Sequence, residues 1–308
     1  MEIKWTYQEQ APIKLKTFLK QKGLSRRLLA TIRNDNGQVE VNGKSGRIVD
    51  KLYPNDQVWL RLPVEKNRKQ SLAKSYVPLK IIYEDRDFLV IDKPARVATI
   101  PSRLHPVDSL VNRVAGYYDL RGYQGIIPHV ATRLDRDTSG LVLFAKHRLA
   151  HALLDQQLRQ HAIDKRYWAL LTGSVTWTKL EVNQPIARLA TSTMKRGVAA
   201  DGKTALTDFE VIHCLGKATL CQVKLHTGRT HQIRVHSQYL GHPLVGDELY
   251  GGDIELPLQR QALHCQQLSF YHPFLEKQLR FVSELPADMQ GYIEKTDKRG
   301  ITSWLKQI

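Results

Sequence analysis

The chain has 308 residues, of which 42% are hydrophobic and 25% charged, and its formal net charge is +16 at pH 7. This composition is typical of one or two globular domains, and the apolar runs fall far short of the roughly 20 residues of a membrane-spanning helix, which excludes an integral membrane protein. Because lysines and arginines that neutralise phosphates release counterions, so large a positive charge favours nucleic acid as the partner.

The cysteines argue against disulfide and zinc chemistry. Cys214, Cys221 and Cys265 are scattered, odd in number and without a CxxC pair, so neither a disulfide framework nor a zinc site is expected. The first ten residues contain acids and lack the apolar stretch of a signal peptide. We therefore expect the chain to lie in the reducing cytoplasm.

The first part of the chain, residues 1–64, is predicted to be a small separate unit. Apolar residues at helical spacing predict a short helix that ends at Gly23, and Ser25 can cap a second helix over residues 26–33. A strand over residues 38–41, a turn and a further strand follow. The predicted order is helix, helix, strand, turn, strand.

This order resembles the small RNA-binding domain of a ribosomal small-subunit protein and of bacterial tyrosyl-tRNA synthetases. The resemblance also rests on residues 24–27 (LSRR) and 39–43 (VEVNG). It implies a basic surface that contacts phosphates, for which Arg26, Arg27 and Lys44 are the candidates. The competing interpretation is a basic helix face that meets only solvent.

A polar, basic stretch over residues 65–78 is predicted to be a linker to a larger domain, residues 79–308. The first two strands of that domain are expected between residues 81 and 91, and the tripeptide DKP follows at residues 92–94. Pro94 can merely end the strand, whereas a resemblance of this tripeptide to a motif of a known family implies that Lys93 and Pro94 brace the sheet near a cleft.

The segment over residues 133–140 (RLDRDTSG) places four charged residues within five positions, with apolar residues on both sides. Apolar residues on both sides of a charged segment place it in a core or at the edge of one. A carboxylate at such a place needs a cation or hydrogen-bond donors. Asp135, between Leu134 and Arg136, is therefore either a member of a structural ion pair or a catalytic carboxylate.

After a helix expected over residues 148–161, residues 165–173 (KRYWALLTG) are predicted to be a strand that carries Tyr167. On its own, Tyr167 is better explained as a core tyrosine with a satisfied hydroxyl, and only the other motifs reverse this interpretation. The stretch 202–209 (GKTALTDF) then brings Lys203 close to a turn.

A second long motif, residues 226–236 (HTGRTHQIRVH), follows a strand expected over residues 218–225. Gly228 permits a tight turn, Thr230 can cap the next helix, and Arg229 at the turn can point into a cleft. The histidines of this motif recur every five residues, which does not fit one helical face, so a metal site is not expected.

Four of these motifs resemble, in sequence and in order, those of the Rlu-type RNA pseudouridine synthases. The motifs are DKP, RLDRDTSG, KRYWALLTG and GRTHQIRVH. The resemblance implies that Asp135 is the catalytic carboxylate, that Tyr167 lies over the target base and relays a proton, and that Arg229 pairs with Asp135. Thr132 stands where the family usually has a histidine.

The same resemblance implies the remaining RNA contacts and the fold. Arg133 is expected to fill the space that a flipped base vacates, and Lys93 and Lys203 are expected to contact the RNA. The implied fold is α+β, with a mixed, mostly antiparallel central sheet and flanking helices, preceded by the small N-terminal α/β module.

The implied activity is the isomerisation of uridine to pseudouridine in structured RNA, either rRNA or tRNA, by a monomer that needs no cofactor and no membrane. Two alternatives remain open at this point. One is a non-catalytic RNA-binding or ribosome-assembly factor on the same fold, and the other is a glycosylase that releases free uracil. Intact Asp135, Tyr167 and Arg229 count against the first alternative, and an analysis of the products for uracil would decide the second.

Overall fold

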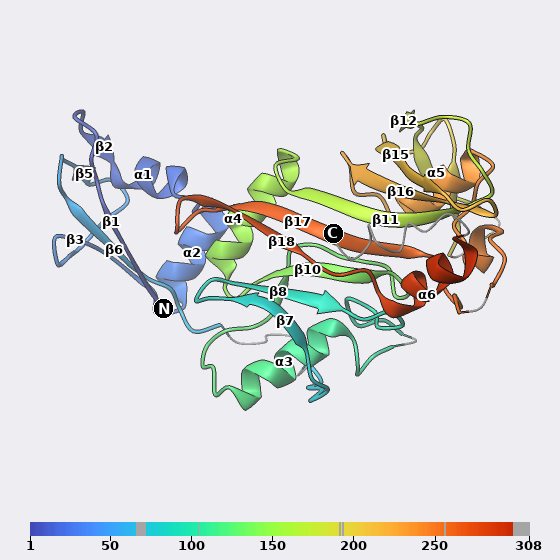
Figure 1. Ribbon diagram of the computed structural model, residues 1–308. Coiled ribbons are helices and arrows are strands. Elements are labelled where there is room, and N and C mark those ends of the chain that lie inside the picture. The colour runs from blue at the N-terminus through green and yellow to red at the C-terminus, as the bar shows by residue number, and fades with distance from the viewer. Residues whose placement is uncertain (66–71, 104, 191, 193, 256, 298–308) are drawn as a thin grey trace.

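The computed structural model describes residues 1–65, 72–103, 105–190, 192, 194–255 and 257–297. A small N-terminal module lies at one end of a long sheet that forms the centre of the molecule (Figure 1). The architecture is α+β with a mostly antiparallel central sheet, which confirms the expected fold class. Residues 66–71 of the predicted linker lie outside the described residues.

The N-terminal module packs two helices against a small sheet. Its elements are β1 (Glu2–Thr6), β2 (Ile13–Lys14), α1 (Leu15–Gln21), α2 (Arg26–Asn34), β3 (Gln38–Val41), β4 (Lys44–Ser45), β5 (Lys51–Leu52) and β6 (Gln57–Arg61). Strands pair in the order β1–β6–β3–β4. Leu28 N donates to Ser25 Oγ at 3.1 Å and so caps α2, as the sequence predicts.

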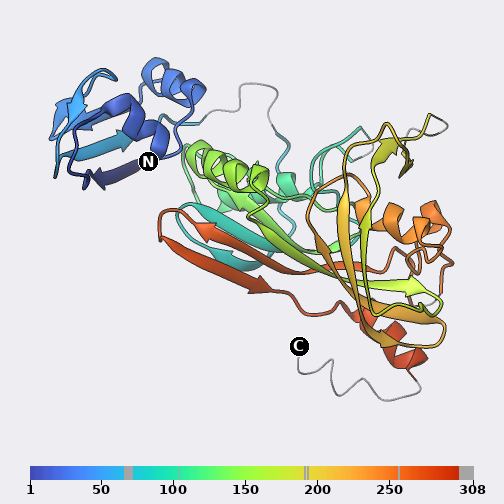
Figure 2. The same cartoon turned by 90° about the horizontal axis from the view of Figure 1, so that it is seen from above.

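The module rests on helix α4 (Arg148–Arg159) of the larger part of the chain (Figure 2). Leu149 of α4 is buried within the apolar cluster of the module, and Leu153 and Phe274 pack against that cluster. At Gly23 an added Cβ would meet Leu153 Cδ2 at 2.3 Å, so the two surfaces are in close contact. The boundaries proposed at residues 64 and 79 remain a prediction.

Among the described residues, ten strands join in the central sheet. They are β7 (Lys80–Glu84), β8 (Phe88–Lys93), β9 (His129–Val130), β10 (Ser139–Ala145), β11 (Asp164–Thr172), β12 (Lys179–Asn183), β15 (Leu206–Cys214), β16 (Ala218–Leu225), β17 (Leu263–His272) and β18 (Lys277–Val282). The order is β12–β15–β16–β11–β17–β10–β8–β7, with β9 on β10 and β18 on β17. Of these described strands, only β10 and β17 pair in parallel, through Ser139–His264 and Gly140–Cys265.

The parallel pair depends on Gly140. Its φ is +110°, and an added Cβ would lie 2.3 Å from Cys265 O, so only glycine fits between the two strands. Because β10 begins at Ser139, the charged segment 133–138 enters the sheet at this point, next to β17 and close to β11. The close strand contact thus determines where the loop of Asp135 lies.

Helices and a hairpin cover the sheet and its far end. They are α3 (Leu110–Leu120), α4, α5 (Gln232–Tyr239), α6 (Ala287–Thr296), the short 3₁₀ helix η1 (Glu248–Tyr250) and the hairpin of β13 (Ile186–Arg188) and β14 (Arg196–Val198). The predicted cap of α5 by Thr230 is wrong. His231 is the N-cap, in the left-handed conformation with φ +59°, and makes no side-chain cap bond. None of the helices in the described ranges combines the length and apolarity needed to cross a bilayer.

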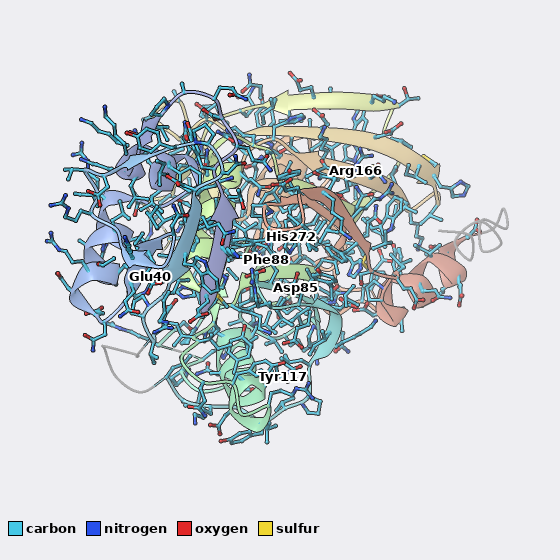
Figure 3. All side chains as sticks on the ribbon, turned by 90° about the vertical axis from the view of Figure 1, so that its left-hand side faces the viewer. Glu40, Asp85, Phe88, Tyr117, Arg166 and His272 are labelled. Carbon is cyan, nitrogen blue, oxygen red and sulfur yellow. The ribbon has the colours of Figure 1, made fainter. Side chains whose placement is uncertain are left out.

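A buried polar cluster occupies the other end of β8 and β10. Asp85 Oδ2 lies 2.7 Å from His272 Nε2, and the ring of Phe88 meets the His272 ring edge-on at 4.7 Å. Figure 3 shows these three side chains together. Since Ala145 pairs with Phe88 whereas Gly140 pairs with Lys93, this cluster and the Asp135 loop lie at opposite ends of β10.

Candidate active site

The residues predicted to be catalytic border one cavity. Asp135 comes from the loop before β10, Tyr167 from β11 and Arg229 from the turn before α5. All three line a cavity of about 770 Å³, a volume typical of pockets that enclose a small ligand. The fold therefore brings together side chains that are far apart along the chain.

Hydrogen bonds hold the Asp135 loop on its N-terminal side. Thr99 Oγ1 donates to Leu134 O at 2.7 Å and accepts from Leu134 N at 3.1 Å. Thr132 Oγ1 accepts from Leu143 N of β10 at 3.0 Å. Thr132, where the family usually has a histidine, thus fixes the start of the loop to the sheet by a bond of its own.

Lys93 anchors the same loop and does not face RNA. Its side chain is fully buried, and its Nζ donates to Pro94 O, Val97 O and Arg136 O at 2.9, 2.8 and 3.0 Å. Because three carbonyls take its three protons, the prediction that Lys93 contacts RNA is wrong. Burial lowers the pKa of Lys93 to about 7, and the negative charge of Asp137 opposes that shift.

Arg234, not Arg229, forms the ion pair with Asp135. Arg234 Nη1 lies 3.4 Å from Asp135 Oδ2, whereas Arg229 Nε donates to Thr204 O at 2.8 Å. The pairing expected of Arg229 is therefore wrong, although Arg229 lines the cavity. The reason is that α5 begins at Gln232, so Arg229 stays in the turn and Arg234 lies in the first turn of the helix.

Two carboxylates share the Arg234 guanidinium. Arg234 Nε and Nη2 donate to the two oxygens of Asp247, both at 2.7 Å. The side chain of Asp247 is 1% exposed, while that of Asp135 is 27% exposed. Asp247 therefore orients the guanidinium from within, and Asp135 is the carboxylate that a substrate can reach.

His231 is a second neighbour of Asp135, although in the sequence it stands out only as one of three histidines whose spacing does not fit a metal site. Its Nε2 lies 3.9 Å from Asp135 Oδ2, and its Nδ1 lies 2.8 Å from the hydroxyl of Tyr250. Burial lowers the pKa of His231, which favours the neutral imidazole. No sequence pattern indicates this contact, because it depends on the left-handed backbone at His231.

Tyr167 lies in the middle of the sheet with its side chain 4% exposed. Burial raises the pKa of Tyr167 well above its usual value, and the adjacent Cys265 thiol adds to this. Tyr167 is therefore a phenol at neutral pH, which offers a ring face and a single proton. Lys165 lines the same cavity, and burial lowers its pKa.

The other predicted RNA-contact residues lie at the rim or on the module. Arg133 is exposed and borders the cavity. Lys203 is exposed beside the β13–β14 hairpin. Arg26, Arg27 and Lys44 are exposed on the N-terminal module, and Arg26 also lines a separate groove of about 610 Å³ there.

Arg234 could have been found from the sequence by the argument that singled out Asp135. It stands between Ile233 and Val235, so a charged residue is again framed by apolar neighbours. Ile233, Arg234 and Val235 are all buried in the structure. The resemblance favoured the first arginine of the motif, Arg229, and so pointed away from Arg234.

Comparison with known proteins identifies the family. A family model described as RNA pseudouridylate synthase matches residues 87–239. The Bacillus subtilis (strain 168) protein named uncharacterized RNA pseudouridine synthase YjbO is 41% identical over 280 residues, which cover 91% of this chain and 98% of that protein. The ribosomal large subunit pseudouridine synthase D of Zymomonas mobilis is 39% identical over 70% of this chain and 71% of that protein.

Two solved structures share the fold of this chain. The human RNA pseudouridylate synthase domain containing 1 superimposes with a TM-score of 0.57 at 25% identity, over 76% of this chain and 95% of that chain. The human RNA pseudouridylate synthase domain containing 4 gives a TM-score of 0.58 at 21% identity, over 70% and 92% of the two chains. The chain therefore belongs to the Rlu-type family and is an RNA pseudouridine synthase, an isomerase that acts on RNA.

Proposed function

We propose that this enzyme converts specific uridines of structured ribosomal RNA to pseudouridine, with Asp135 as the catalytic carboxylate. Two relatives named ribosomal large subunit pseudouridine synthase D, from Zymomonas mobilis and Vibrio parahaemolyticus, support ribosomal RNA as the substrate class. The net charge of +16 is in keeping with a large polyanionic partner.

The observation that carries the proposal is the grouping of Asp135, Arg234 and Tyr167 around one cavity. A uridine inside an RNA helix is out of reach of Asp135, so the base must leave its stack, at a cost of a few kcal/mol. The ring of Tyr167 offers a face on which the extruded base can stack. Arg133 at the cavity rim then fills the space that the base has left.

The reaction breaks the bond between the ribose and N1 of the base, rotates the base and forms a bond from the ribose to C5. The proton on C5 is lost and N1 gains a proton, so the product is an isomer of uridine. Asp135 acts at the anomeric carbon, as nucleophile or as stabiliser of the cationic sugar. Arg234 takes the role that the resemblance gives to Arg229, since its guanidinium pairs with the Asp135 carboxylate and holds it in place. Oxidation and reduction play no part, so the chain's own residues suffice.

The N-terminal module, residues 1–64, is proposed to bind RNA outside the cavity. Arg26, Arg27 and Lys44 are exposed on it and would contact phosphates, which position an RNA without reading its sequence. In this proposal the module supplies affinity and the larger domain, residues 79–308, supplies the chemistry.

A tritium-release assay on ribosomal RNA labelled at C5 of uridine, prepared from a strain that lacks the enzyme, tests the proposal. We expect Asp135→Asn to reduce the rate at least about 1,000-fold, since a neutral amide cannot act at the anomeric carbon. Asp137→Asn is the matched control, because Asp137 belongs to the same loop but pairs with Arg136. An active Asp135→Asn variant would remove Asp135 from the mechanism.

A further inference from the structure

The hydroxyl of Tyr250 connects the β13–β14 hairpin to the catalytic site. Tyr250 is 2% exposed, and its hydroxyl oxygen accepts from Arg196 N at 3.0 Å. The same hydroxyl lies 2.8 Å from His231 Nδ1. The Tyr250 ring lies beneath the guanidinium of Arg234, 4.9 Å from its Cζ to the ring centroid. One side chain therefore touches both of the groups that face Asp135.

These contacts determine where the proton of His231 lies. The Tyr250 oxygen already accepts from the Arg196 amide, and within the described part of the chain Nδ1 of His231 is the acceptor in contact with the hydroxyl proton. Burial raises the pKa of Tyr250 and lowers the pKa of His231, so both groups are neutral. Tyr250 therefore donates to Nδ1, and the proton of the imidazole is on Nε2.

Nε2 of His231 faces the carboxylate. It lies 3.9 Å from Asp135 Oδ2, and Arg234 Nη1 lies 3.4 Å from the same oxygen. Both distances are those of contacts that shorten when a substrate fills the cavity. The contacts of Asp135 with side chains in the described ranges all involve Oδ2, which leaves Oδ1 for the substrate.

We propose that Tyr250 and His231 are positioning residues for the reaction: Tyr250 fixes His231 as an Nε2–H donor, and His231 and Arg234 together hold Oδ2 of Asp135 so that Oδ1 acts at the anomeric carbon. The inference rests on the proposed role of Asp135. To that role it adds the tautomer of His231, the oxygen of Asp135 that reacts, and the two positioning residues.

The first test is Tyr250→Phe, which keeps the ring under Arg234 and removes only the hydroxyl. His231 Nδ1 then loses its donor, so the neutral ring can place its proton on either nitrogen and part of the population loses Nε2–H. We expect the single-turnover rate at pH 8 to fall about tenfold, as for loss of a hydrogen bond to a charged group, with the RNA dissociation constant unchanged.

The pH profile separates this role from a structural one. The imidazolium form of His231 always carries Nε2–H, so lowering the pH through the pKa of His231 should restore the rate of Tyr250→Phe toward that of the wild type. Among the described residues, the charged groups that face His231 are Asp135, Arg234, Asp247 and Arg196, and the remaining titratable group is Tyr250. The four charged groups are present in both wild type and Tyr250→Phe. The ratio of their single-turnover rates at each pH therefore isolates the effect of the Tyr250 hydroxyl.

A second pair of variants acts on His231 itself. His231→Gln keeps an N–H donor near the position of Nε2, and His231→Ala removes it. We expect His231→Gln to be faster than His231→Ala, and Tyr250→Phe to have no further effect on the rate when combined with His231→Gln, because the amide has no tautomer to fix. Tyr292→Phe is the matched control, since it removes another buried tyrosine hydroxyl, in α6.

The outcomes are distinguishable from failure of the proposed function. If Asp135→Asn is active, the proposed role of Asp135 fails and this inference with it. If Asp135→Asn is inactive while Tyr250→Phe reacts at the wild-type rate, only the inference is overturned. A rate of Tyr250→Phe that is reduced by the same factor at every pH also overturns it, because a loss of packing would have that signature.

Discussion

The two arginines of the segment 228–236 differ in what they touch. Arg234 is buried and bonded to Asp247 as well as to Asp135. Arg229 lies in the turn and bonds to a backbone carbonyl. A rigid guanidinium that holds two carboxylates at once cannot be replaced by a lysine, whose ammonium is a single point charge. We therefore expect Arg234 and Arg229 to respond differently to substitution by lysine.

We expect Arg234→Lys to lower the single-turnover rate about 100-fold or more, because Asp135 loses its fixed partner. Arg229→Lys should change the rate by less than about threefold, since its bond to Thr204 O can be made by an ammonium. Circular dichroism at the assay temperature would verify that both variants are folded. Equal losses for the two variants would contradict the assignment of the ion pair to Arg234.

Lys93 makes stability depend on pH in a defined direction. The pKa of Lys93 is about 7 in the folded chain against a usual 10.5, so between these values the unfolded chain binds more protons. The free energy of unfolding that Lys93 contributes therefore rises with pH across this range. At lower pH the buried ammonium opposes folding.

We expect Lys93→Met to lose this dependence, so that wild type gains stability relative to the variant between pH 7 and pH 10. Urea unfolding followed by tryptophan fluorescence at several pH values would measure it. Lys277→Met is the control, since Lys277 is exposed and its variant should differ from wild type by a constant amount. A constant difference for Lys93→Met as well would show that its amine is not desolvated.

The sequence made Asp135 and Tyr167 candidates because both stand in long motifs, and Asp135 also stands in a charged segment with apolar residues on both sides. It did not reveal that Lys93 is buried, because a lysine after a strand is exposed far more often than not. It also did not separate Arg229 from Arg234. That choice depends on where α5 begins, and helix boundaries are set by tertiary contacts that single-residue preferences do not contain.

At the scale of elements, the contact of β10 with β17 positions the Asp135 loop. The two strands are parallel over only two residue pairs, at Ser139 and Gly140. Most elements were predictable, such as α2 with its cap at Ser25. The start of α5 was not, because a histidine with positive φ replaces the expected threonine cap. The order of the strands in the sheet was not predictable either, because local sequence patterns do not specify which distant strands pair.

Gly140→Ala should destabilise the fold by about 3 kcal/mol or more, since its Cβ would overlap the β17 backbone at a positive φ. Gly228→Ala is the comparison, because that Cβ would meet open space, and its effect should stay within about 1 kcal/mol. Chemical denaturation of both variants tests this expectation. A near-neutral Gly140→Ala would mean that the two strands can separate without loss.

At the scale of the whole molecule, the proposed mode of RNA binding rests on the net positive charge and on the N-terminal module. The module contacts α4 through Leu149 and Leu153, so its exposed basic residues are carried on the same body as the cavity. Phosphate contacts of this kind add affinity that depends on salt but not on sequence. Their effect should therefore be separable from catalysis.

We expect Arg26→Ala combined with Arg27→Ala to weaken RNA binding and to reduce the slope of log K against log salt by about 1.5, at roughly 0.7–0.9 for each phosphate that is no longer neutralised. The single-turnover rate at saturating enzyme should not change. Lys277→Ala combined with Arg280→Ala removes the same charge from β18, where both residues are exposed. Identical effects of the two double variants would mean that only net charge matters.

The hydrogen bonds of Thr99, Thr132 and Lys93 hold the Asp135 loop in place. This order affects the free energy of RNA binding. A loop that is already ordered loses no conformational entropy when RNA arrives. In the proposed reaction, the free energy of association would then be available for extracting a nucleobase from its neighbours, and differences in affinity between RNAs should follow how easily each base unstacks. Selectivity between RNAs would in that case depend on how easily the RNA deforms rather than on any rearrangement of the enzyme.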